Sequence, residues 1–232
     1  MQNKLNFKTG FFLIFILFSQ LIKPAHSQKL ICRYKFEKNH YDIQKYRDNE
    51  DSFVSGYERI GIKPQKFDSF PSRWGGQFVL LYRIKRSQYL GVCTDFYSTG
   101  SRVHYRDYSG ELTYDQVLKR ASLGIHYEIK FMGFKHFQLR PFMQISGIKT
   151  KWRHEYKSRI YEAENIENME RETYTLGIIP SVLLQYELGL FTLGAEIGFE
   201  FSYYKLPMGN DLTFEHDWEG ARAGISLGVA LF

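Results

Sequence analysis

The chain has 232 residues, of which 44% are hydrophobic, 17% aromatic and 24% charged, and its formal net charge is +6. This length fits one domain of ordinary size, and the aromatic content excludes a disordered or collagen-like chain. Three lysines and no acidic residue lie in 1–27, so the remainder carries only +3, which is no electrostatic footprint for nucleic acid. Two cysteines exclude a disulfide-dense scaffold and a four-cysteine zinc site.

The first 27 residues have the pattern of an export signal. Two lysines precede the apolar run 11–18 (FFLIFILF), and the small residues of 25–27 match the positions that a signal peptidase reads. This run is too short to cross a hydrocarbon core of ~30 Å as a helix. We therefore expect a signal peptide over 1–27, a mature chain that begins at Gln28, and export across the inner membrane.

Residues 28–52 leave two interpretations open. Apolar residues at the even positions of 30–36 alternate with a partly charged set, which fits a first strand followed by a long outer loop. Otherwise the segment is a periplasmic lead-in, and a weaker alternation over 53–63 forms the first strand. The number of strands is the same in both cases. A disulfide between Cys32 and Cys93 also stays open, because it requires the N-terminal segment to fold back into the barrel.

From residue 74 onward the hydropathy alternates with period two. Alternating segments lie at 74–84, 89–105, 115–130, 137–152, 173–188, 191–203 and 220–231. The connections between them are short at 85–88, 131–136 and 189–190, and longer and polar at 64–73, 106–114, 153–172 and 207–217. Short turns at one rim and long loops at the other predict an all-β, eight-stranded antiparallel up-and-down transmembrane β-barrel over 53–232, with both ends on the periplasmic side.

Aromatic residues gather at both ends of the predicted strands, which favours a membrane barrel over a soluble lipocalin-like binder. The step from Tyr174 to Tyr186, at ~3.3 Å per residue and ~40° of tilt, projects to about 30 Å, the thickness of the hydrocarbon core. A soluble barrel would also carry charge on its outer face, whereas here the large-residue faces are almost uncharged. We therefore predict an outer-membrane location, with ten interface aromatics: Trp74, Tyr82, Tyr97, Tyr127, Trp152, Tyr174, Tyr186, Phe191, Tyr203 and Trp218.

The opposite faces of the strands carry isolated charges that we assign to the lumen. The inward set is Arg83, Asp95, Arg120, His126, Glu128, Arg140, Glu187, Glu196, Glu200 and Arg222. An eight-stranded barrel is just wide enough for side chains to fill it, so inward charges must pair. Hairpin counting places Glu200 diagonally opposite Arg222, and Glu128 near Arg140. These relations predict a closed, ion-paired interior, with a narrow charged path as the alternative.

Residues with catalytic chemistry do not form a convincing site. Ser122, His126 and Glu128 share one face of a strand, but four residues of strand span about 13 Å, too far for a nucleophile and its base. Three histidines in or beside the long loops show no catalytic or metal-ligand spacing: His104, His154 and His216. We expect no catalytic residue, no metal and no cofactor, and keep an enzyme that modifies outer-membrane lipid as the alternative. The mixed-charge segment 153–172 is expected to be a solvated loop that is able to contact lipopolysaccharide phosphates or a partner protein.

The alternation over 53–232, Gly-rich strands such as 123–125 and 227–229, and the terminal Phe232 together resemble a known group of proteins. They are the small eight-stranded outer-membrane β-barrels of Gram-negative bacteria, in particular PorT-like barrel-domain proteins of the Bacteroidota. The resemblance implies a non-enzymatic protein that serves envelope structure, surface contact, or a secretion or assembly machine. It also implies outer-membrane lipid, lipopolysaccharide, barrel-assembly machinery, and envelope or secretion-system proteins as partners. A terminal Phe is similar to the signal by which that assembly machinery recognises a last strand.

Overall fold

The computed structural model describes residues 30–41, 44–67, 69–72, 74–108, 110–160, 163–207 and 218–231. In chain order the elements are β1 (Leu30–Tyr41), α2 (Gln44–Glu58), β2 (Gln65–Phe67), β3 (Trp74–Lys85), β4 (Gln88–Arg106), β5 (Gly110–Ile129), β6 (Met132–Phe134), β7 (Phe137–Ile160), β8 (Ala163–Leu188), β9 (Phe191–Pro207) and β10 (Gly220–Leu231). The predicted signal peptide, His216 and Phe232 lie outside the described residues. No helix in the described part of the chain is long and apolar enough to span a membrane.

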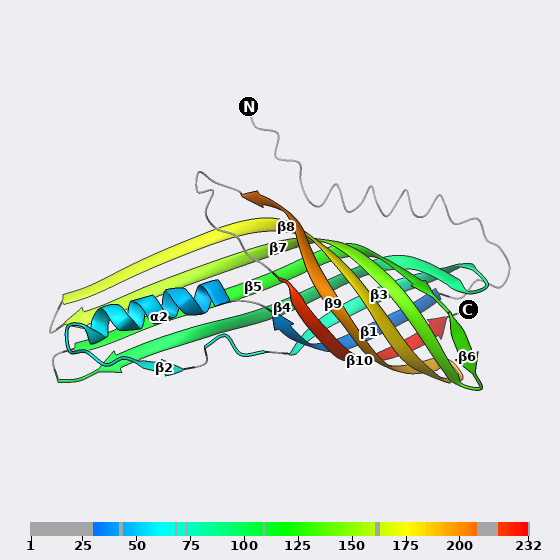
Figure 1. Cartoon of the computed structure of the whole chain (residues 1–232), viewed down its shortest axis with the longest axis horizontal. Coiled ribbons are helices and arrows are strands. Elements are labelled where there is room, and N and C mark those ends of the chain that lie inside the picture. The colour runs from blue at the N-terminus through cyan, green and yellow to red at the C-terminus, as the bar shows by residue number, and fades with distance from the viewer. Residues whose placement is uncertain are drawn as a thin grey trace, which may run out of the picture.

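Eight strands close into an antiparallel ring, as Figure 1 shows. The order around the ring is β1, β3, β4, β5, β7, β8, β9, β10 and back to β1. Leu30 of β1 lies opposite Tyr82 of β3 on one side and Leu231 of β10 on the other, which closes the ring. The short strand β6 pairs with β7, and β2 lies beside β4. The predicted eight-stranded antiparallel barrel is therefore confirmed.

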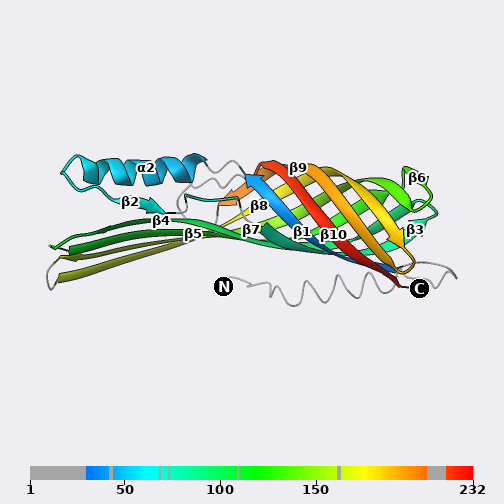
Figure 2. The same cartoon turned by 90° about the horizontal axis from the view of Figure 1, so that it is seen from below.

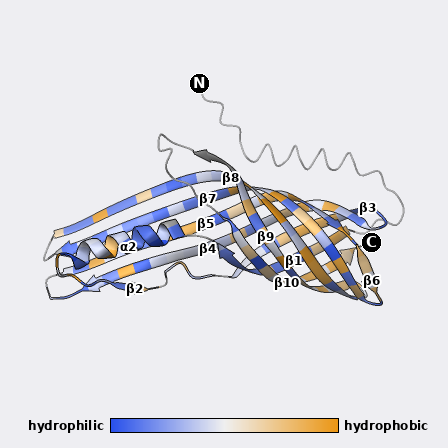
Figure 3. Cartoon of the chain, viewed as in Figure 1, coloured by the Kyte–Doolittle hydropathy of each residue, from blue (hydrophilic) through white to orange (hydrophobic). Residues whose placement is uncertain are grey.

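Alternation along each strand separates an apolar outer surface from a polar interior. In β9, for example, Ile197 is 67% exposed on the outside whereas Glu200 is fully buried inside. Figure 3 shows hydrophobic residues concentrated on the strands of the barrel. Side chains at i and i+2 of a strand share one face, so this pattern follows directly from the period of two in the sequence.

The first strand of the ring lies at β1, which decides between the two interpretations of the N-terminal region. The weak strand predicted over 53–63 is wrong, because these residues belong to α2 and the turn after it. Tyr46, Glu50 and Val54 are all buried, and their spacing of four residues is that of one face of a helix.

Four strands of the ring continue far beyond it, so the predicted loops over 106–114 and 153–172 are largely strand. We call this extension the projecting sheet; it consists of 98–106 of β4, 110–119 of β5, 151–160 of β7 and 163–172 of β8. Ten residues of strand at ~3.3 Å each give it a length of about 30 Å. The sequence pattern missed it because both faces of 163–172 are polar, which removes the contrast in hydropathy. Continuous backbone pairing joins its strands, and ion pairs lie across them, such as Lys151 with Glu170 at 2.6 Å and Lys157 with Glu164 at 2.9 Å.

Helix α2 packs on one face of the projecting sheet, as the view in Figure 2 shows. The ring of Phe53 stacks on Tyr114 of β5 with 4.2 Å between the ring centroids, and Val54 is buried beside Val103 of β4 and Tyr114. The hydroxyl of Tyr57 lies 2.9 Å from that of Tyr156 of β7. The helix therefore fixes three of the four projecting strands, and it lies between them and solvent.

Candidate functional site in the barrel interior and at its mouth

One group of charges in the lumen centres on Glu128 of β5. Its carboxylate accepts hydrogen bonds from Arg33 of β1 and from Arg140 of β7, each at 2.7 Å. Nε2 of His126 lies 3.3 Å from the same carboxylate. Arg33 also donates to the side-chain oxygen of Gln185 at 2.8 Å, so that residues from four strands meet here. Two guanidinium groups thus share one carboxylate inside a ring with no room for bulk water.

A second group of charges lies nearer the mouth and centres on Glu200 of β9. This carboxylate accepts hydrogen bonds from Arg120 at 2.8 Å and from Arg222 at 3.2 Å. Arg120 also bonds Asp95 of β4 at 3.1 Å, while Arg222 pairs with Glu37 of β1. Between the two groups, Lys35 of β1 donates to Oε1 of Glu196 of β9 at 3.1 Å. We call the two groups and this linking pair the lumen network.

The lumen network balances its charges within the described residues. Its five cations and five carboxylates are Arg33, Lys35, Arg120, Arg140, Arg222, Glu37, Asp95, Glu128, Glu196 and Glu200. A buried charge without a partner costs several kcal/mol, so this balance is a condition for a stable ring. The two pairs that hairpin counting predicts, Glu200 with Arg222 and Glu128 with Arg140, are both present.

All predicted lumen residues except two have nearly fully buried side chains inside the ring. Arg83 and Glu187 are the exceptions, since they are half-buried, and Glu187 lies 3.4 Å from Arg140 near the short turns. Sequence reasoning missed Arg33, Lys35 and Glu37 because it left the position of the first strand open. The alternation of 30–37 was the signal that places all three on the inner face.

Three of the ten predicted interface aromatics lie inside instead: Tyr97, Trp152 and Trp218, which are 8%, 4% and 1% exposed. The ring of Tyr97 covers Gly75 of β3, where a Cβ atom would lie only 1.7 Å from it, so this glycine makes room for the tyrosine. The hydroxyl of Tyr97 donates to Glu37. The other seven are exposed or half-buried, and Trp74 is 62% exposed.

An aromatic cluster closes the mouth of the barrel above the lumen network. The cluster contains Tyr46, Phe70, Leu118, Ile148, Trp152 and Trp218, with Tyr41 packed against it. The indole of Trp218 donates to the Thr150 hydroxyl at 2.6 Å, and the guanidinium of Arg120 lies 5.4 Å from the centre of the Trp218 ring. Tyr46 comes from α2 and Phe70 from the segment after β2, so elements outside the ring complete this cap.

Phe70 holds a backbone conformation that a bulky residue rarely adopts, with φ of 42°. Its side chain is 1% exposed, and its N–H donates to the carbonyl of Gly100 at 3.0 Å. Such a conformation costs on the order of 1–3 kcal/mol and persists only where the surroundings impose it. Burial of the ring in the cap supplies that constraint. The cap is therefore a specific arrangement rather than a loose covering.

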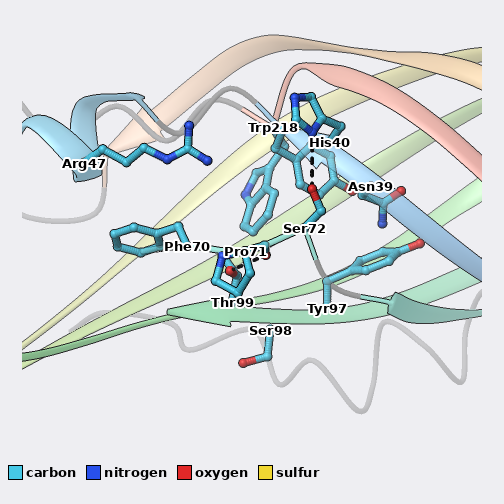
Figure 4. Close-up of a pocket in the computed structure, with 11 residues that line it drawn as sticks. Asn39, His40, Arg47, Phe70, Pro71, Ser72, Tyr97, Ser98, Thr99 and Trp218 are labelled. Atoms are coloured by element: carbon cyan, nitrogen blue, oxygen red, sulfur yellow. Dashed lines mark hydrogen bonds between the residues drawn. The ribbon is translucent and has the colours of Figure 1, made fainter. Parts of the chain in front are cut away.

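A small hollow lies beside the cap, and Figure 4 shows the residues that line it. It lies where β1, the N-terminal turns of α2, the segment 70–72 and β4 meet. Nδ1 of His40 lies 3.2 Å from the Ser72 hydroxyl, and Arg47 approaches from the helix. The amide of Asn39 is buried and has no hydrogen-bond partner among the described residues. Polar groups and the aromatic side chains of Phe70 and Trp218 therefore share the lining of this hollow.

Ser122, His126 and Glu128 do not form a nucleophile held by a base. Ser122 Oγ is buried without a hydrogen-bond partner among the described residues, although His126 and Glu128 bond each other on the same face. No cluster of three or more His, Cys, Asp or Glu side chains in the described part of the chain is arranged to hold a metal ion. Cys32 and Cys93 are both free thiols, because they lie on opposite faces of their strands.

Burial shifts the pKa values of three groups between α2 and the projecting sheet in the direction that favours their neutral forms. Burial lowers the pKa of His154, whose ring packs against Tyr114 with 4.6 Å between centroids. Burial also raises the pKa of Tyr114 to about 12. The pKa of Tyr57 rises to about 12 through burial, and then through its hydrogen bond with Tyr156. In each of the three groups burial favours the uncharged side chain.

No known family model matches the chain, and no curated protein matches it. Among solved structures, Ail, the attachment invasion locus protein of Yersinia pestis, is 10% identical over 89% of this chain and 100% of Ail, with a TM-score of 0.37. The N-terminal β-barrel domain of OprF from Pseudomonas aeruginosa is 12% identical over 88% of this chain and 97% of that domain, with a TM-score of 0.29. Neisserial surface protein A is 12% identical over 88% of this chain and 96% of its own, with a TM-score of 0.32. Likenesses at this level carry no argument about function.

Removing one member of the Glu200–Arg222 pair is expected to cost about 3–5 kcal/mol of unfolding free energy, because a buried charge loses its partner. The double substitution Glu200→Gln with Arg222→Met should cost less than the sum of the single ones, with a coupling of about 1–3 kcal/mol. Denaturant unfolding of the barrel in lipid vesicles measures all three variants.

The exposed pair Arg102–Asp115, at 2.6 Å on the projecting sheet, is the matched control. Its coupling should not exceed about 1 kcal/mol, because solvent screens an exposed pair. Additive effects at Glu200 and Arg222 would contradict the role of the lumen network.

Proposed function

We propose that the chain is a non-enzymatic outer-membrane β-barrel whose closed ring anchors the projecting sheet at the cell surface for contact with other molecules. The observation that carries this proposal is the combination of three features. An apolar outer belt surrounds the ring, an ion-paired and capped interior fills it, and a polar sheet extends beyond only one of its rims.

The outer belt supports a membrane position. Ile125 on β5, Ile197 on β9 and Ile225 on β10 are 55%, 67% and 58% exposed, and further large apolar residues surround them on the same outer face. A water-soluble monomer rarely exposes an apolar surface that surrounds the whole molecule. Lipid removes this surface from water, while the closed ring leaves no unpaired strand edge in the hydrocarbon region.

The interior supports an anchoring role rather than transport. The lumen network crosses the ring from β1 to β5, β7 and β9, and the aromatic cap closes the mouth above it. A solute would have to displace paired, buried charges, which is costly in a narrow ring.

The direction of the projecting sheet supports surface contact. Figure 1 shows that β10 ends at the rim with the short turns and that the projecting sheet extends from the opposite rim. In outer-membrane barrels the short turns face the periplasm, so the sheet faces the outside. The export signal predicted over 1–27 supplies the route. Outer-membrane lipid, lipopolysaccharide and barrel-assembly machinery are then its first partners, and a PorT-like role in a secretion or assembly machine stays a prediction.

Substitution of Ile197 by Arg, near the middle of the outer belt, should destabilise the barrel in lipid by about 2–4 kcal/mol. The reason is that the charge enters the hydrocarbon core. Asn168→Arg on the projecting sheet is the control and should change stability by no more than about 0.5 kcal/mol. Equal effects of both variants on unfolding in vesicles would contradict the membrane position.

Orientation is testable by labelling cysteines in intact cells with a membrane-impermeant maleimide. Asn168→Cys on the exposed part of β8 should react in intact cells, whereas Lys135→Cys in the turn after β6 should react only after lysis. Cys93 is buried, which limits its background reaction, and a Cys32→Ser background removes the other thiol. Labelling with the reverse pattern would overturn the proposed orientation.

The purified, refolded protein should give no stable conductance steps in planar lipid bilayers, because the lumen network and the cap fill the ring. Heat-modifiable migration on gels provides the control that the sample is folded. Sustained porin-like steps from folded protein would show an open lumen and contradict the anchoring role.

A further inference from the structure

We infer that the outer edge of β8 over 163–172 is a docking site for an extended, basic segment of a partner protein, which adds to the projecting sheet as a further antiparallel strand. This inference rests on the proposed function in one respect: the projecting sheet must face the outside.

The two edges of the projecting sheet differ. On the β4 side the chain itself covers part of the edge, because Gln65 and Phe67 of β2 pair with His104 and Arg102. On the β8 side the pairing with β9 stops at Thr173, opposite Pro207. Within the described residues no strand pairs with that side of 163–172. In the described part of the chain, one edge of the sheet is thus partly covered by β2 and the other, over 163–172, has no covering strand.

The open edge is accessible and has the backbone groups that strand addition uses. All described side chains from Ala163 to Glu170 are exposed, and α2 packs on Val103, Tyr114 and Tyr156 of the other three strands. The segment contains no Pro or Gly, so every residue supplies both an N–H and a C=O. In an edge strand, the backbone N–H and C=O groups that point away from the neighbouring strand have no partner in the sheet. An extended peptide forms hydrogen bonds with these groups.

Charge defines the partner. Residues 163–172 contain four glutamates and one arginine, a net charge of −3. The glutamates of the outward face are each paired with a lysine on the β7 side: Glu172 with Lys149 at 2.8 Å, Glu170 with Lys151 at 2.6 Å and Glu164 with Lys157 at 2.9 Å. Each of these carboxylates has further acceptor positions, and none of the strands that the structure describes lies on the opposite side to supply a second cation. A strand with lysine or arginine at alternate positions would continue the pattern across the edge.

Charge also disfavours two other occupants of this edge, a second copy of the chain and the chain's own segment 208–217. A second copy paired antiparallel through β8 would place glutamates beside glutamates, since Glu164, Glu167, Glu170 and Glu172 recur along the whole segment. The chain's own segment 208–217, which follows the last residue paired with Thr173, carries three acidic residues and no Lys or Arg. Ile166 and Met169, 50% and 43% exposed on the two faces, add apolar contact for a partner strand in which valine alternates with lysine.

The test measures binding of a fluorescein-labelled decapeptide, in which lysine alternates with valine, to the full-length protein folded in detergent micelles. Fluorescence anisotropy should show saturable binding, and infrared spectra of the ¹³C-labelled peptide should show its amide band move to strand frequencies. The triple variant Glu164→Gln, Glu170→Gln, Glu172→Gln should weaken binding by about tenfold, because three exposed charge contacts are lost. The matched control Glu111→Gln with Asp115→Asn, on the same face of β5 but away from the edge, should leave affinity within about twofold.

Two peptide controls separate strand addition from simple charge attraction. A peptide with glutamate in place of lysine should not bind, and a lysine peptide methylated on every backbone nitrogen, which keeps its charges but cannot donate, should lose binding. Equal binding of the methylated peptide, no binding of the lysine peptide, or indifference to the triple variant would each overturn the inference. A dimer of the protein alone, cross-linked through Asn168→Cys, would instead assign the edge to a second copy. Heat-modifiable migration and correct labelling of Asn168→Cys in cells keep the proposed function intact if peptide binding alone fails.

Discussion

Closure of a narrow ring around balanced buried charges is the constraint on which the rest of this structure depends. Arg33 reaches Glu128 across 95 residues of sequence, and Arg222 reaches Glu37 across 185. Pairs such as Glu128 with Arg140 join neighbouring strands, but the β1 residues Arg33 and Glu37 meet Glu128 and Arg222 only when β1 joins the ring, so ring closure completes the lumen network. A partly closed ring would leave arginines and carboxylates unpaired in a space without bulk water, which is expensive. The same alternation that directs these charges inward directs isoleucines and phenylalanines outward. A barrel with this charged interior therefore has an apolar outer face, which requires an apolar environment.

The sequence predicted the ring well because each strand there has two chemically different faces. Along 191–203 the contrast between Ile197 and Glu196 persists for the whole strand, so period two is visible without knowledge of the neighbours. The contrast vanishes over 163–172, where both faces are polar and the stabilising contacts are pairs such as Lys151 with Glu170. Such pairs become visible only when the register is known. Helix α2 was missed for a related reason: its buried face contains Glu50 between Tyr46 and Val54, which weakens the helical pattern.

The interior site was predictable to the extent that it is local. Glu200 and Arg222 lie on adjacent strands, so counting residues from the hairpin was sufficient to place them together. Arg33 and Glu37 required the position of β1, which alternation alone left open. Trp152 shows a different error: a tryptophan at a strand end suggested a membrane interface, although it shares the parity of the inward residues Ile148 and Thr150. The position of a residue in the in–out alternation predicted its side better, because the backbone geometry of a strand dictates that alternation. The preference of tryptophan for membrane interfaces is only statistical.

The long strands connect two regions of very different stability. In the ring the ion pairs are buried and strongly interdependent, whereas on the outward face of the projecting sheet they are exposed, and exposed pairs contribute about 0–1 kcal/mol each. Helix α2 packs apolar and aromatic side chains on Val103 of β4, Tyr114 of β5 and Tyr156 of β7, whereas the described side chains of 163–170 are all exposed, so support falls toward the β8 edge. Regions that bind are commonly drawn from this low-stability end of a structure. A partner strand would supply backbone hydrogen bonds that β8 lacks on that side, so binding and local ordering are thermodynamically linked: whatever binds the ordered edge also stabilises it.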